Sequence, residues 1–166
     1  QAAVDSLISL LPHSYLSVHV RLDDTAFNLI DPPDRWTGNN TANREEHVIS
    51  LIVASIIGSS CVSQHGARSL YLVTNYSPSH PVTKKRTARL VEALKQASFP
   101  VVTRKSLMSH ALKGKEQKKL EHLPNLRAMR DMTPEHWNYI DMLVSEQSSC
   151  FIPSLAPSLM SYMITR

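Results

Sequence analysis

His19 and Arg21 are the two residues whose types and spacing point most directly to chemistry. They stand near the end of an apolar stretch, SYLSVHVRLDD, which spans residues 14–24. Strand alternation separates its apolar side chains from its polar ones, which are Tyr15, Ser17, His19 and Arg21. An arginine at a strand tip can bind a phosphate in bidentate fashion, whereas a pair with Asp23 or Asp24 would make it structural. A single histidine in a strand is more often a hydrogen-bonded core residue than a catalyst.

Other polar residues stand where a ligand could reach them. Asp141 lies among apolar neighbours in a helical segment, where an acid caps a helix, pairs with a cation or binds a ligand. Ser158 follows Pro157 at the start of the last expected helix, where a hydroxyl and free N–H groups either hold an anion or cap the helix. Asn75 and Ser154 lie at or just past the ends of expected strands.

Strand and helix patterns alternate along the chain, and they must position these residues. Strands are expected over 14–24, 68–75, 99–103 and 150–154. Helices are expected over 2–11, 44–60, 83–98, 105–114, 133–149 and 156–166, and a long loop over 23–43. This alternation predicts an α/β fold of Rossmann-like type, with a parallel sheet flanked by helices in a single domain over residues 1–166. Ligands of such sheets bind beyond the carboxyl ends of the strands, so one edge would gather His19, Arg21, Asn75 and Ser154.

Composition excludes several classes of function. The chain has 166 residues, of which 42% are hydrophobic, enough for one globular core. The net charge is +4, and part of the basic excess lies in the run KGKEQKK, which is expected to be a solvated face. Aromatic residues make up only 6% of the chain, so nucleic-acid binding is not expected. With four glycines and no G-x-G-x-x-G, there is no dinucleotide fingerprint. The longest apolar run, 48–57, is too short to span a membrane. Cys61 and Cys150 either pair or remain buried thiols.

Four segments in order carry a family resemblance: YLSVHVRLDD, LYLVTN, EALKQASFPVVTRKSLMS and NYIDMLVSEQSSCFIPSLAPSLMSYMITR. Together they resemble the carboxyl-terminal half of the GDP-fucose protein O-fucosyltransferase family, the plant-type branch most closely. The similarity extends over residues 14–166. It implies the donor-binding lobe of a GT-B glycosyltransferase, with the amino-terminal acceptor lobe absent from this chain.

The resemblance also implies roles for individual residues. Arg21 matches the family arginine that contacts the diphosphate and stabilises the departing nucleotide, and His19 its neighbour in the donor pocket. Asp141 matches an acid of the nucleotide pocket that faces the base. Ser158 matches a residue that holds phosphate at a helix start. Two positions depart from the family: Pro157 replaces a small polar residue, and Leu159 replaces a residue that is often aromatic.

The implied reaction is inverting transfer of fucose from GDP-fucose to a hydroxyl of a protein or glycan acceptor, in the lumen of the ER or Golgi. Arg21 would stabilise the charge that develops on the β-phosphate. No Asp-x-Asp triplet occurs, so neither a metal nor another cofactor is expected. The lone lobe is expected to be inactive. Two alternatives stay open: a non-catalytic binding module with a degraded donor pocket, and a related transferase that uses UDP-rhamnose.

Overall fold

Within the described residues, four strands form one parallel sheet in the order β3-β2-β1-β4. The computed structural model describes residues 2–36, 41–66, 69–74, 80–113 and 132–156. The strands are β1 (Tyr15–Val20), β2 (Ser69–Thr74), β3 (Val101–Thr103) and β4 (Cys150–Ile152). The parallel α/β fold of Rossmann-like type that the alternation predicts is therefore confirmed.

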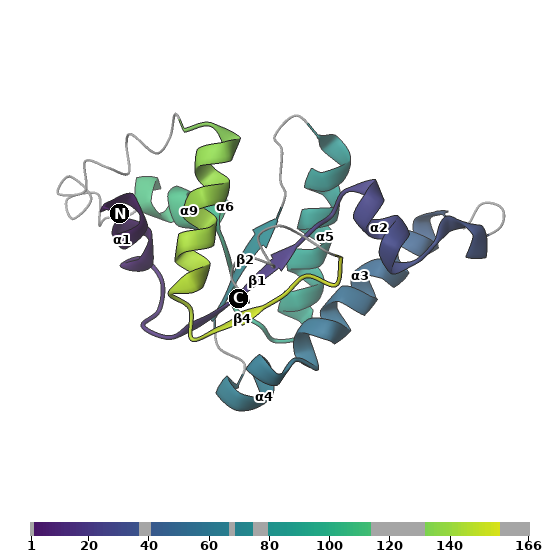
Figure 1. Cartoon of the computed structure of the whole chain (residues 1–166), viewed down its shortest axis with the longest axis horizontal. Coiled ribbons are helices and arrows are strands. Elements are labelled where there is room, and N and C mark those ends of the chain that lie inside the picture. The colour runs from purple at the N-terminus through teal and green to yellow at the C-terminus, as the bar shows by residue number, and fades with distance from the viewer. Residues whose placement is uncertain (1, 37–40, 67–68, 75–79, 114–131, 157–166) are drawn as a thin grey trace.

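Helices cover both faces of the sheet (Figure 1). One face packs against α1 (Ala2–Ile8), α6 (Arg104–Lys113) and α9 (Pro134–Glu146). The other packs against α2 (Asp24–Ile30), α3 (Thr41–Ile57), α4 (Ser60–His65) and α5 (Pro81–Gln96). A short 3-10 helix, η1 (Pro33–Arg35), follows α2. The result is a three-layer arrangement with one apolar core on each side of the sheet.

Strand β1 lies in the interior of the sheet, and all six of its residues are buried. Leu16, Val18 and Val20 point into the core under α3 and α5, as the alternation predicts. Tyr15 points to the opposite face, where its hydroxyl donates to the carbonyl of Val144 on α9 at 2.6 Å. The strand ends at Val20, so it is shorter than expected.

The expected loop over 23–43 is wrong in its first half, because that segment forms α2 and η1. Asp23 caps α2 by accepting a hydrogen bond from the Ala26 N–H at 2.9 Å, and Phe27 is fully buried in the core. The cap at Asp23 and the burial of Ala26 and Phe27 thus outweigh the turn-forming composition of the segment. Helix α4 was also not expected; it begins after Ser59, whose side chain accepts from the Val62 N–H. The expected final helix begins at the end of the described residues, and 157–166 lie outside them.

Cys61 and Cys150 form a disulfide, with their Cα atoms 5.6 Å apart. This bond joins α4 to the first residue of β4 and closes a separation of 89 residues. The pairing that composition left open is therefore present. In the part of the chain that the structure describes, no helix is long and apolar enough to cross a membrane.

Candidate functional site

The strand order places a topological switch point between β1 and β4. From β1 the chain moves outward to β2 and β3, and it then returns to the opposite side of β1 to form β4. In open α/β sheets the crevice at such a point, beyond the carboxyl ends of the strands, is the usual ligand site. Three residues, here called the strand-tip group, lie there: His19, Arg21 and Ser154. The backbone N–H of Arg21 faces the Ser154 hydroxyl oxygen, with the two atoms 3.5 Å apart.

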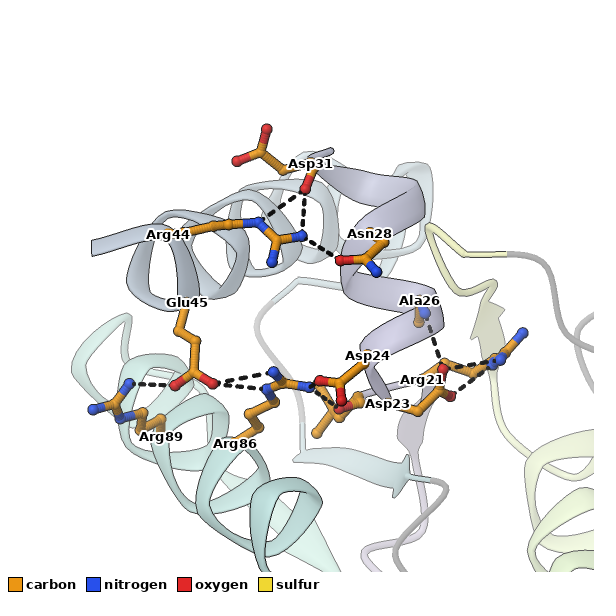
Figure 2. A network of polar contacts seen from close by, with 11 residues as sticks. Arg21, Asp23, Asp24, Ala26, Asn28, Asp31, Arg44, Glu45, Arg86 and Arg89 are labelled. Atoms are coloured by element: carbon orange, nitrogen blue, oxygen red, sulfur yellow. Dashed lines mark hydrogen bonds and ion pairs between the residues drawn. The ribbon is translucent and has the colours of Figure 1, made fainter. Parts of the chain in front are cut away.

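Arg21 forms a bidentate ion pair with Asp23 (Figure 2). Its Nε donates to one carboxylate oxygen at 3.0 Å and its Nη2 to the other at 3.1 Å. Partial burial raises the pKa of Asp23, but the Ala26 N–H and the Arg21 guanidinium outweigh that effect and lower it below its usual value. The structural pairing of Arg21 is therefore present. Its side chain remains 28% exposed, so a ligand can still reach the guanidinium.

A second arginine holds the segment that carries Asp23 (Figure 2). Arg86 of α5 is buried and forms ion pairs with Asp24 at 2.8 Å and with Glu45 of α3 at 3.1 Å. It also donates to the Leu22 carbonyl at 3.0 Å and lies 3.9 Å over the ring of Phe27. These contacts fix the start of α2 to α3 and α5, so the turn just beyond β1 is held in place.

His19 is buried near Arg21, and it is a neutral imidazole at physiological pH. Burial, and secondarily the nearby positive charge of Arg21, lowers its pKa from 6.5 to about 4. Among the three members of the strand-tip group, Arg21 alone therefore brings positive charge toward an anionic ligand.

Asp141 is a residue of α9, and its side chain contacts β2 and the first residue of α6. It is 3% exposed, and one carboxylate oxygen accepts from the Tyr71 hydroxyl at 2.6 Å. The other accepts from Nη1 of Arg104 at 3.2 Å. Burial raises the pKa of Asp141 from 3.8 to about 6, although Arg104 and the Tyr71 hydroxyl oppose that rise. The sequence interpretation did not identify Tyr71 or Arg104. A signal for Arg104 was available, because it directly follows β3 as Arg21 follows β1.

Asp141 also lines a cavity of about 400 Å³ at the carboxyl ends of β2 and β3, here called the β2–β3 cavity. Its walls are largely apolar side chains of β2 and α5. Three hydroxyls and three cations join them: Thr74, Thr87, Thr103, Lys84, Arg104 and Lys105. A buried acid, hydroxyls and cations among apolar walls are a combination suited to a polar, partly aromatic ligand.

The structure thus brings the strand-tip group together at β1 and β4, and it places Asp141 by β2 and α6 on the β2–β3 cavity. Asn75 and Ser158 lie outside the described residues, as do Pro157 and Leu159. Within the described ranges, His, Cys, Asp and Glu side chains form no group of three that could hold a metal ion.

Comparison with known proteins identified no relative: no family model matches the chain, and no match was found among curated proteins or solved structures. The functional conclusion therefore depends on the residues and on their arrangement.

Proposed function

We propose that this chain is the nucleotide-sugar-binding lobe of an inverting glycosyltransferase, with GDP-fucose as its donor. The observation that carries the proposal is the position of Arg21, an arginine with a partly exposed side chain immediately past β1 at the switch point of the sheet. The β2–β3 cavity, with Asp141 in its lining, lies at the same carboxyl edge. A nucleoside diphosphate would extend along this edge, with its phosphates at Arg21 and its base at Asp141.

The chemistry of each end fits this orientation. Guanine offers neighbouring N–H groups from its ring and its exocyclic amine, and a carboxylate can accept both. Uracil offers a single ring N–H, so Asp141 would favour guanine. A cavity of about 400 Å³ lies within the usual range for small-molecule sites.

At the phosphate end, Arg21 would act where charge develops. The oxygen of an acceptor hydroxyl forms a bond to the anomeric carbon of fucose, and the bond from that carbon to the β-phosphate oxygen breaks. GDP leaves with the electron pair, and the hydroxyl proton passes to a base outside this lobe. A fixed guanidinium at the β-phosphate stabilises the leaving charge, and loss of one such donor typically costs on the order of 10²–10³ in turnover.

A non-catalytic binding module is the second candidate, and the Arg21–Asp23 pair favours it. Both carboxylate oxygens of Asp23 already engage the guanidinium. If that pair serves only to fix α2, the strand tip would have no need of a phosphate.

Calorimetric titration with GDP, UDP and ADP distinguishes these functions. The variants are Arg21→Ala and, as a matched control, Arg89→Ala, which removes an exposed arginine from α5. Saturable binding of GDP over the other nucleotides, lost in Arg21→Ala and kept in the control, supports the proposal. Preference for UDP would replace the donor with a uridine diphosphate sugar such as UDP-rhamnose. Absence of nucleotide binding, or binding that is indifferent to Arg21→Ala, would overturn the proposal and favour the module.

A further inference from the structure

The two partners of Asp141 come from two different elements and hold its carboxylate from two sides. Arg104, the first residue of α6, donates from Nη1 at 3.2 Å, and its guanidinium carbon lies 4.7 Å from the ring centroid of Trp137 on α9. Tyr71 of β2 donates from its hydroxyl at 2.6 Å. The aromatic ring restrains the guanidinium, so the direction of its hydrogen bond is fixed.

This arrangement does more than neutralise a buried charge. A carboxylate has about four acceptor positions, and the two bonds from Tyr71 and Arg104 use one on each oxygen. One position on each oxygen can still accept from a ligand in the β2–β3 cavity. An ion pair at this depth contributes little to stability compared with apolar residues of the same volume, so stability alone is a weak reason for its presence.

We propose that Arg104 and Tyr71 are positioning residues, which keep Asp141 ionised and oriented so that its carboxylate accepts two N–H groups of the base. This inference rests on the proposed function, and it names how the site selects its base. Neither residue needs to touch the ligand, because both act through Asp141.

The pH dependence of binding distinguishes this role from a merely structural one. Protonation of Asp141 removes an acceptor and adds a donor, so affinity for guanine falls as the pH drops through about 6. The pKa of Asp141 sets the midpoint of this pH dependence, and both Arg104 and Tyr71 lower that pKa. Among the residues that the structure describes, the other charged side chains that line the β2–β3 cavity are those of Lys84 and Lys105, and both lysines are exposed.

The experiment measures GDP affinity by calorimetry from about pH 5 to about pH 8.5, a range that spans the Asp141 midpoint and its expected upward shift. The proteins are the wild type, Arg104→Gln, Tyr71→Phe and, as a charge-matched control, Lys95→Gln, at an exposed lysine in the last turn of α5 that does not line the cavity. The terminal phosphate of GDP also titrates near 6, on the order of a phosphomonoester, so each profile is read as a difference from the wild type. Tyr71→Phe deletes one oxygen and keeps the ring, so it tests the role even if Arg104→Gln does not fold.

Removal of an opposite charge at this distance should move the midpoint upward by about 1 unit or more in Arg104→Gln, and by less in Tyr71→Phe. For a shift of about 1 unit, the affinity of Arg104→Gln should fall roughly tenfold near pH 5 and roughly twofold near pH 7, and the loss should disappear at the alkaline end. Arg104→Lys, which keeps the charge, should restore a midpoint close to that of the wild type. Lys95→Gln should leave the midpoint where it is.

The outcomes separate this inference from the proposed function. If the wild type binds GDP and all profiles share one midpoint, Arg104 and Tyr71 have no positioning role, while the proposed function stands. A uniform loss of affinity with an unshifted midpoint also overturns the inference. If the wild type binds no GDP at any pH, the proposed function fails first, and the inference fails with it.

Discussion

Replacement of Asp141 by asparagine should stabilise the protein increasingly as the pH rises. The carboxyl group is 3% exposed, and its pKa in the folded state is about 6 instead of 3.8. The folded state therefore binds this proton more tightly than the unfolded state. The stability that this group contributes is complete below about pH 4 and is lost as the pH rises through about 6.

The magnitude follows from the two pKa values. Ionisation of Asp141 costs the folded state about 1 kcal/mol at pH 4.5 and about 3 kcal/mol at pH 7.5. Asparagine has nearly the same shape, cannot ionise and still accepts the hydrogen bond from the Tyr71 hydroxyl. The stability of Asp141→Asn relative to the wild type should therefore increase by about 2 kcal/mol across this interval.

Urea unfolding of both proteins at several pH values measures this difference directly. The matched control is Asp34→Asn, which makes the same chemical change at an exposed acid of η1. If the relative stability of Asp141→Asn stays constant with pH, burial does not disfavour the charge of Asp141. A loss of GDP binding in a variant of higher stability would indicate that Asp141 serves the ligand and not the fold.

Three further predictions concern the framework around the site. Arg86→Met should lower the free energy of unfolding by about 2 kcal/mol, since it leaves the buried Leu22 carbonyl and the partly buried Glu45 carboxylate without a charged donor. Arg89→Met, at a 41% exposed side chain, should lower it by less than about 1 kcal/mol, and equal losses in denaturant unfolding would contradict the assigned network. Reduction of the Cys61–Cys150 disulfide should lower the free energy of unfolding by about 2–4 kcal/mol, and unfolding curves that coincide with and without reductant would refute this. Ser98 lies just past α5 and has a φ of 65°. Ser98→Gly should raise the free energy of unfolding by up to about 1 kcal/mol, as measured by thermal unfolding, and no increase would indicate that the backbone at Ser98 is unstrained.

Local pattern was sufficient to predict the sheet and most of its helices. Alternation in β1 correctly assigned Leu16 to one face and Tyr15 to the other, because a strand has a period of two that burial reinforces. The same kind of reasoning missed α2. The Asp, Pro and Asn residues between 23 and 43 predicted a loop, whereas in the structure Asp23 caps a helix and Phe27 is buried.

The candidate site was less accessible to sequence reasoning. Arg21 stood out because its chemistry and its place at a strand end are both local properties. The partners of Asp141 could not be predicted, since Tyr71 and Arg104 lie 70 and 37 residues away along the chain. Only the crossover from β3 to β4 brings α9 over β2, and that order of strands is a property of the whole fold.

Binding of a diphosphate by Arg21 at the switch point of the sheet can be tested with a cycle of four affinities. GDP and GMP are titrated into the wild type and into Arg21→Ala under one set of conditions. Charge-assisted hydrogen bonds to the β-phosphate are worth about 1.5–3 kcal/mol, so the wild type should bind GDP about 10–100 times more tightly than GMP. Arg21→Ala should reduce this ratio nearly to one. A ratio that is unchanged in the variant would contradict it, because Arg21 would then not contact the phosphate that distinguishes the two nucleotides.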